Sequence, residues 1–262
     1  MERPDRPDGT FGLTPTALVV IPAVFALALL IMIQLASVGL EGGDYETLTK
    51  SSTTLTRQAL VPHAIFLLVG LAVVAYLRLW REAGFVQPLP GVTSRRWTLV
   101  PPALMLLGVV IGFAGALNDR PVGYLVVLFV ATMAVGFNEE VWFRGIVLTG
   151  YRRTMDDSRA IAVTAVLFGL GHLVNAALGL SVADVLTQVV ATTVGGIVFG
   201  VIRVRTGSIF PAVVTHGLYD AALLSIAPDA EEFGTVLLGR LLVLIAVGGV
   251  LVVRRLRAQS PK

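Results

Sequence analysis

The sequence PVGYLVVLFVATMAVGFNEEVWFRGIVL, residues 121–148, decides the fold of this chain. A transmembrane helix needs about 20 mostly apolar residues. This stretch is longer than that, and its C-terminal third carries the charged residues Glu139, Glu140 and Arg144. Seven further stretches are comparably apolar. The sequence therefore predicts about eight spanning helices, at residues 15–40, 58–79, 97–117, 121–148, 159–178, 185–204, 208–227 and 235–253.

The composition favours lipid as the surroundings of these helices. Hydrophobic residues make up 55% of the 262 and charged residues only 14%, against about 25% charged in a typical soluble domain. The mean hydropathy is +0.83. The chain has no cysteine, which excludes disulfides and thiolate metal sites. We therefore predict an all-α, polytopic membrane helix bundle, multi-pass in the cell membrane.

The basic residues predict the orientation of the bundle. With the N-terminus inside, 15 of them fall on the cytoplasmic side and four on the other, Arg144 being set aside. This bias places both termini in the cytoplasm. Because the basic residues lie in short clusters between apolar stretches, they indicate topology and no nucleic-acid partner. The four outer residues are Lys50, Arg57, Arg120 and Arg240.

The chain divides by its motifs, not by linkers. Residues 1–14 form a polar cytoplasmic tail, and residues 15–117 hold helices without a motif. Residues 118–227 form the predicted catalytic core. Residues 228–262 supply the last helix and a basic tail. The short connections leave no room for a separate soluble domain.

Six ionisable residues remain inside the apolar stretches once loop charges are removed. Each costs about 2.5–3.5 kcal/mol at mid-bilayer on insertion scales, so such residues pair or perform a function. They lie on three predicted helices, and their i, i+4 spacings put partners on one helix face. The six are Glu139, Glu140, Arg144, His172, His216 and Asp220.

Each of these residues also has a structural interpretation. Glu140 and Arg144 can be no more than a neutralising pair, and either histidine can bond a backbone carbonyl. Asp220 can serve only to orient His216. We give His63 the structural interpretation, because it follows Pro62 near the outer end of its helix with no partner in register.

Three motifs in order resemble those of a known family. Residues 139–144 read EExxxR, residues 168–172 read FxxxH, and residues 216–220 read HxxxD. Together with RTGSIFPA at 205–212, they are similar to the CPBP family, which contains CAAX prenyl proteases and bacterial bacteriocin-processing or immunity proteins. The resemblance covers roughly residues 121–225.

The resemblance implies a role for each motif residue. Glu139 would activate water, Glu140 would pair with Arg144, and His172 would help to polarise the water. His216 and the residue at Asp220 would stabilise the oxyanion. Asp220 departs from members with Asn at that place. An ionised Asp cannot donate a hydrogen bond, so Asp220 must be protonated or must orient His216.

The same residues also fit the chemical requirements of peptide hydrolysis, independently of the family resemblance. Peptide hydrolysis needs a base for water, donors for the oxyanion and an acid for the leaving amine. Glu139, Glu140, His172, His216 and Asp220 supply these groups without a nucleophilic Ser or Cys. The zinc motif HExxH is absent. We favour a site without a cofactor, with zinc as the alternative, held by His172, His216 and Glu139.

The predicted function is that of an intramembrane endopeptidase acting on a membrane-embedded or membrane-proximal peptide or protein. The alternatives are a catalytically silent immunity or scaffold protein and a proton-coupled transporter, since intramembrane Glu, His and Asp also build proton relays. The richness in Ala, Val, Leu and Arg indicates a bacterium of high genomic GC, in which prenylated substrates are not expected.

Overall fold

The computed structural model describes residues 45–86, 100–117 and 120–226, with scattered residues between 17 and 35. All regular structure in these ranges is helical. The elements are α2 (Tyr45–Leu48), α3 (Ser52–Thr54), the π-helical turn η1 (Leu55–Leu60), α4 (Val61–Tyr76), α5 (Val100–Ala116), α6 (Val122–Glu140), the π-helical stretch η3 (Val141–Val147), α7 (Leu148–Tyr151), α8 (Asp157–Gly171), the 3-10 turn η4 (His172–Ala176), α9 (Val182–Thr206) and α10 (Phe210–Ile226).

Four helical segments of the described chain are long and apolar enough to cross a membrane. They are Ser52–Tyr76, Val122–Tyr151, Asp157–Ala176 and Val182–Thr206. They overlap the predicted spans at 58–79, 121–148, 159–178 and 185–204. This result confirms a helical, multi-pass membrane protein. Helices α5 and α10 fall in two more predicted spans, but each has only 17 residues.

The remaining predictions on topology stay predictions. The span at 235–253 and both tails, 1–14 and 228–262, lie outside the described residues, and so does most of 15–40. The count of eight spans and the cytoplasmic termini are therefore untested.

Two predicted helices are not regular throughout. The span at 121–148 changes to π-helix directly after Glu140, and π-helical turns are frequent at functional sites. The span at 159–178 leaves α-helical geometry at Gly171, and His172 begins a 3-10 turn. Hydrophobic periodicity cannot register either change, because both segments stay apolar. Both irregularities lie at motif residues.

Small residues set the spacing of the helices that carry the motifs. A Cβ on Gly136 of α6 would lie 2.7 Å from the backbone nitrogen of Gly217 in α10. A Cβ on Gly196 of α9 would lie 3.1 Å from Ala165 in α8. Only glycine permits backbones this close, as small-xxx-small spacings predict. The Gly136–Gly217 contact brings Glu139 and Glu140 beside His216.

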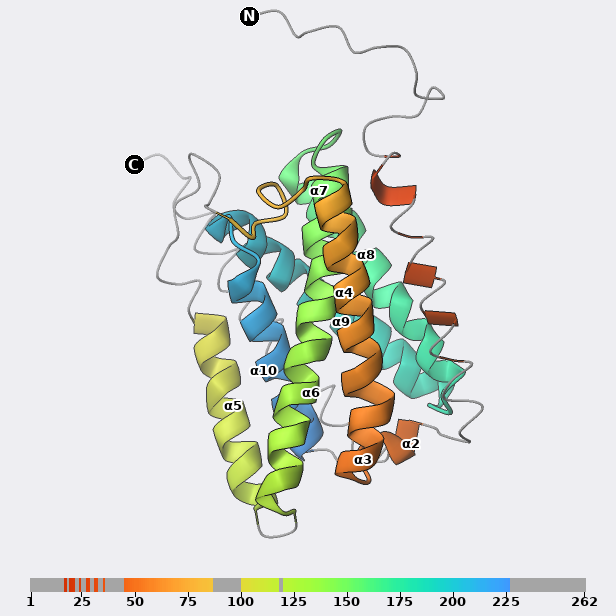
Figure 1. Ribbon diagram of the computed structural model, residues 1–262, viewed down its shortest axis with the longest axis vertical. Coiled ribbons are helices and arrows are strands. Elements are labelled where there is room, and N and C mark those ends of the chain that lie inside the picture. The colour runs from red at the N-terminus through yellow and green to blue at the C-terminus, as the bar shows by residue number, and fades with distance from the viewer. Residues whose placement is uncertain are drawn as a thin grey trace, which may run out of the picture.

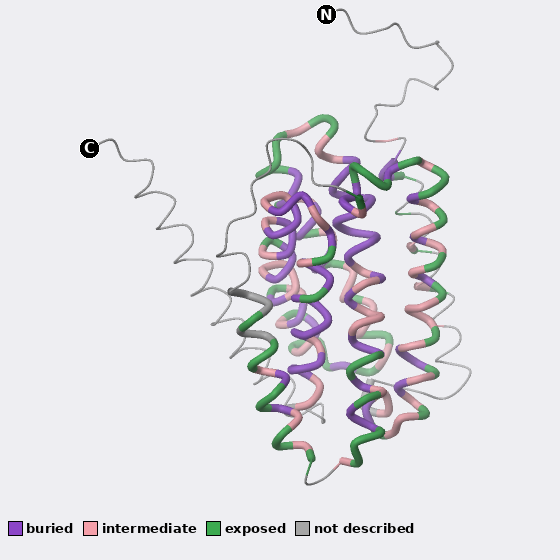
Figure 2. Tube along the Cα trace, turned by 60° about the vertical axis from the view of Figure 1, so that its left-hand side comes forward, coloured by how far each residue is buried: buried purple, intermediate pink, exposed green. Residues whose placement is uncertain are grey.

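The helices form one bundle with two distinct ends (Figure 1). Helices α4, α6 and α10 run side by side, with α5 against α10 and α8 against α9. At the lower end in Figure 1 lie α2, α3 and the turn from α5 to α6, and at the upper end lies α7. Buried residues face the interior and exposed ones face outward (Figure 2). Many exposed residues are large and apolar, such as Leu68, Ile111 and Leu186, which suits contact with lipid.

Candidate active site

Glu140 is the centre of a buried polar cluster. Its side chain is 0% exposed. One carboxylate oxygen, Oε1, accepts hydrogen bonds from Arg144 Nη1 at 2.8 Å and from His216 Nδ1 at 3.0 Å. The other oxygen, Oε2, is buried and has no partner among the described residues. Glu140 therefore does more than neutralise Arg144, because it also joins α6 to α10.

Arg144 extends this cluster to a third helix. Its Nη2 donates to the backbone oxygen of Gly196 in α9 at 3.1 Å. Its guanidinium carbon lies 4.4 Å from the ring centroid of Phe168 and 5.3 Å from that of Phe199. Cation–π contacts of this kind strengthen when water is excluded. The predicted pair of Glu140 and Arg144 is present and holds α6, α8 and α9 together.

The ring of His216 is held by a stacked aromatic ring and by a hydrogen bond at one nitrogen. It stacks on Phe199, with ring centroids 4.7 Å apart. Because Nδ1 donates to Glu140, the nitrogen that remains for chemistry is Nε2. This atom lies 3.5 Å from Glu139 Oε2 and 3.5 Å from Asp220 Oδ2. Both distances exceed an ordinary hydrogen bond, so a small shift of the side chains would complete either contact.

Three carboxylates surround His216, and they differ in the ring nitrogen that they approach. Glu140 holds Nδ1 of His216, while Asp220 and Glu139 face Nε2. The sequence offered Asp220 as the group that orients His216. Here Glu140 occupies the orienting position.

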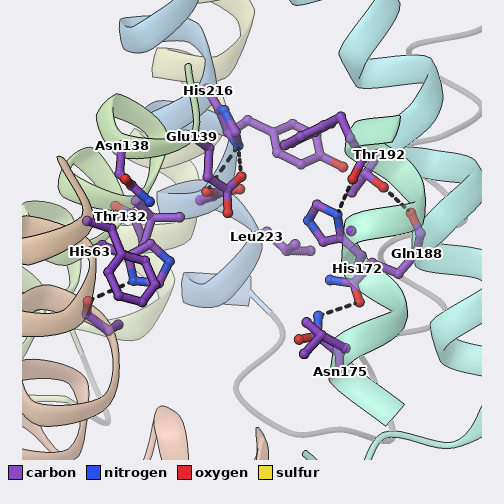
Figure 3. Close-up of a pocket in the computed structure, with 18 of the residues that line it drawn as sticks. His63, Thr132, Asn138, Glu139, His172, Asn175, Gln188, Thr192, His216 and Leu223 are labelled. Carbon is purple, nitrogen blue, oxygen red and sulfur yellow. Dashed lines mark hydrogen bonds and ion pairs between the residues drawn. The ribbon is translucent and has the colours of Figure 1, made fainter. Parts of the chain in front are cut away.

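His172 belongs to the opposite side of the site. Its Nδ1 donates to the backbone oxygen of Phe168 at 3.0 Å. Its ring packs edge-on against the Phe168 ring, with the ring centroids 5.0 Å apart. This bond leaves Nε2 as the nitrogen available to a ligand. Figure 3 shows His172 across the cavity from Glu139 and His216. No hydrogen bond or ion pair of the described chain joins His172 to either residue.

The site lines a cavity of about 270 Å³ inside the bundle. Glu139, His172, His216 and Asp220 all line it. His63, to which the sequence assigned a structural role, also lines this cavity. Its Nδ1 donates to the backbone oxygen of Ala59 at 2.9 Å, as the structural interpretation expects.

Several polar residues of the cavity were missed by the motif search. Asn138 is 3% exposed, and its Oδ1 has no partner among the described residues. It could have been found by spacing, since Val135, Asn138, Glu139 and Trp142 all line the cavity at helical intervals. The other polar residues of the cavity could not be recognised from the sequence, because single amides and hydroxyls are common in membrane helices. They are Thr132, Asn175, Gln188 and Thr192.

The ligand set suggested for zinc is not assembled here. Among the described residues, no three His, Asp or Glu side chains form a group that could hold a metal ion. Zinc would need ligand atoms about 2.0–2.2 Å away in a tetrahedral arrangement. His172 would have to move toward Glu139 and His216 to complete such a set.

These features define a multi-pass helical membrane protein with a Glu–His site enclosed by three motif helices. Residues 121–222 match the sequence model of the family described as type II CAAX prenyl endopeptidase, Rce1-like. The matched stretch contains all three motifs and the whole polar cluster. The family implies membrane-bound protease activity. A search of curated proteins found no match to this chain.

Proposed function

We propose that the chain is an intramembrane endopeptidase in which Glu139 activates the attacking water. The observation that carries the proposal is the 3.5 Å approach of Glu139 Oε2 to His216 Nε2 at the wall of the cavity. The family match supports the class of reaction. The pairing of a carboxylate and an imidazole supports this particular mechanism.

Burial distinguishes the base from its neighbour. The Glu139 side chain is 21% exposed and lines the cavity, whereas that of Glu140 is 0% exposed and accepts two hydrogen bonds on one oxygen. A base must reach the water that it activates. Of these two glutamates, only Glu139 meets this condition, and Glu140 acts by holding His216 and Arg144.

The proposed reaction proceeds in two stages. Glu139 takes a proton from water as the water oxygen bonds to the scissile carbonyl carbon. His216, with both ring nitrogens protonated, stabilises the oxyanion through Nε2–H while Nδ1–H donates to the carboxylate of Glu140. The C–N bond then breaks, and Glu139 returns its proton to the leaving amine. Water is the only co-reactant.

Asn138 is the second oxyanion donor in this proposal. An ionised Asp220 cannot donate, so the site needs an N–H from elsewhere. The carboxamide of Asn138 lines the same cavity as Glu139, and its oxygen has no partner among the described residues. It can therefore turn its NH₂ toward a substrate carbonyl without breaking a bond through that oxygen.

The decisive experiment compares the wild type with Glu139→Gln. Membranes that contain each protein are incubated, and new peptide N-termini are identified by mass spectrometry. Wild type should generate termini that are absent with Glu139→Gln, because Gln keeps the size of the side chain but cannot accept the proton. A general base contributes about 10²–10⁴-fold. The matched control is Glu82→Gln, which removes an exposed carboxylate paired with Arg153.

The same experiment separates the rival functions. Identical termini from wild type and Glu139→Gln would contradict the proposed base. No new termini from the wild type across membranes of several hosts would favour the silent immunity or scaffold protein. Proton-coupled uptake by reconstituted wild type would favour the transporter.

Zinc remains the alternative within the protease class. Bound by His172, His216 and Glu139, it would polarise the water and the carbonyl. We expect exhaustive chelation to leave activity intact and elemental analysis to find well under one metal per chain. Stoichiometric zinc that is lost and restored together with activity would instead assign these three residues as ligands.

A further inference from the structure

The cavity occupies only one half of the bundle. From Glu139 and His216 it extends toward the end that carries α2 and α3. On segment 52–76 it is lined by Leu55, Gln58, Ala59, His63 and Phe66, and by none of the residues from 67 to 76. On α10 it is lined from His216 onward and never by residues 210–215. The lining reaches Leu48, Leu178 and Leu224, which lie near the ends of their elements.

The opposite end of the bundle is sealed by side chains. Beyond Glu140, every residue of η3 is buried, including Trp142 and Arg144. Arg203, 1% exposed, donates to the backbone oxygens of Ala83 and Glu82 and ties the turn after α4 onto α9. That contact is close, since a Cβ on Gly84 would lie 2.7 Å from the Arg203 guanidinium carbon. Ile209, 0% exposed, lies in the same core as Ala83.

The basic residues of the described chain are distributed unevenly between the two ends. Setting Arg144 aside, seven lie toward the sealed end and three toward the open end. By the positive-inside rule, the sealed end faces the cytoplasm. The seven are Arg78, Arg81, Arg152, Arg153, Arg159, Arg203 and Arg205, and the three are Lys50, Arg57 and Arg120.

We propose that the cavity opens on the extracytoplasmic side and that the substrate is an exported or membrane-anchored polypeptide whose cleaved segment reaches the site from there. The nature of the substrate rests on the proposed function, whereas the direction of access rests on the position of the cavity and on the distribution of the basic residues. The route would carry an extended segment past an apolar rim to Glu139 and His216.

The chemistry of the rim fits an extended apolar segment. Leu48, Leu178 and Leu224 offer an apolar surface. Further in, Asn175 Nδ2 donates to Gln188 Oε1 at 2.8 Å, and both amides line the cavity. Amides of this kind can exchange their mutual bond for bonds to a peptide backbone. A folded domain would not fit in about 270 Å³.

The absence of cysteine makes the direction of access directly measurable. Single cysteines are placed at Leu178 and Thr192, which line the cavity, and at the exposed Ser158 near the sealed end. Right-side-out and inside-out membrane vesicles are treated with a small, charged, membrane-impermeant methanethiosulfonate. After denaturation, the remaining thiols are counted by a mass-tagged maleimide.

We expect Leu178→Cys and Thr192→Cys to react in right-side-out vesicles and to be largely protected in inside-out ones. Ser158→Cys should show the reverse. Reaction of Thr192→Cys from the cytoplasmic face, or from neither face, would overturn the proposed route. Reaction of Ser158→Cys from the outside would overturn the orientation.

Repeating the labelling in the Glu139→Gln background keeps the two proposals apart. The pattern of labelling should be the same as with Glu139 intact, because access does not depend on turnover. Correct labelling without peptidase activity would leave the route standing and remove the proposed function. Peptidase activity with labelling from the cytoplasmic face would do the opposite.

Discussion

The two walls of the cavity are held together in different ways. On the α6–α10 wall, formed by Glu139, Glu140 and His216, a buried carboxylate bonds both an imidazole and the Arg144 guanidinium. On the η4–α9 wall, formed by His172, Asn175, Gln188 and Thr192, the bonds are between neutral groups, and among the described residues the His172 ring bonds only a carbonyl of its own helical segment. Charge-assisted hydrogen bonds are roughly twice as strong as neutral ones. Stability and chemistry should therefore depend on the same residues at the first wall and on different residues at the second.

The strongest test of this contrast is Arg144→Ala. Removing Arg144 leaves the Glu140 carboxylate buried with His216 as its one remaining bonded partner, and breaking a buried pair costs about 3–5 kcal/mol. We expect a lower folded yield and a lower melting temperature in detergent. The double change Glu140→Gln with Arg144→Ala should recover part of the loss, because no buried anion is then left.

Arg153→Ala is the matched control for this prediction. Arg153 also pairs with a glutamate, Glu82 at 2.8 Å, but both side chains are partly exposed. Such surface pairs contribute about 0–1 kcal/mol. If Arg144→Ala runs as a monodisperse protein that melts like the wild type, the α6–α10 wall is not held by this cluster.

The sequence predicted the convergence of the three motifs better than it predicted how they meet. Regular i, i+4 spacing fixed Glu140 beside Arg144, because that geometry lies within one helix. The bond from His216 to Glu140 depends on the approach of Gly136 to Gly217 between two helices. No pattern in one helix determines how far another lies from it.

The other features that the sequence did not predict also leave no trace in the pattern of a single helix. The change to π-helix after Glu140 and the 3-10 turn at His172 both leave the hydrophobic pattern intact. His63 joined the cavity because α4 packs along α6. The one-sided opening is likewise a property of the assembled bundle.

A second test compares the two motif histidines. His216→Ala should lose activity and also stability, because Glu140 loses a hydrogen-bond partner at its only bonded oxygen. His172→Ala should lose activity with little change in melting temperature, since its one bond to a backbone carbonyl is worth about 1 kcal/mol. Melting curves and turnover of the purified variants measure both quantities.

Non-additivity sharpens this second test. If Glu139 and His172 act on one water, the double variant should be little slower than either single variant. Independent, multiplying losses would show that His172 serves a separate step. Equal destabilisation by His172→Ala and His216→Ala would remove the contrast between the walls.

The smallest effect is expected for His63→Ala, and it is informative because His63 and His172 are so alike. Each donates Nδ1–H to the carbonyl four residues earlier, His63 to Ala59 at 2.9 Å and His172 to Phe168 at 3.0 Å. Each lines the same cavity. Burial and local bonding therefore cannot distinguish them, and only position relative to the motif carboxylates does. We expect His63→Ala to keep turnover close to that of the wild type and to melt like His172→Ala. A loss of turnover as deep as that of His172→Ala would mean that any imidazole in the cavity supports the reaction, and the role given to His172 by its motif would then have no basis.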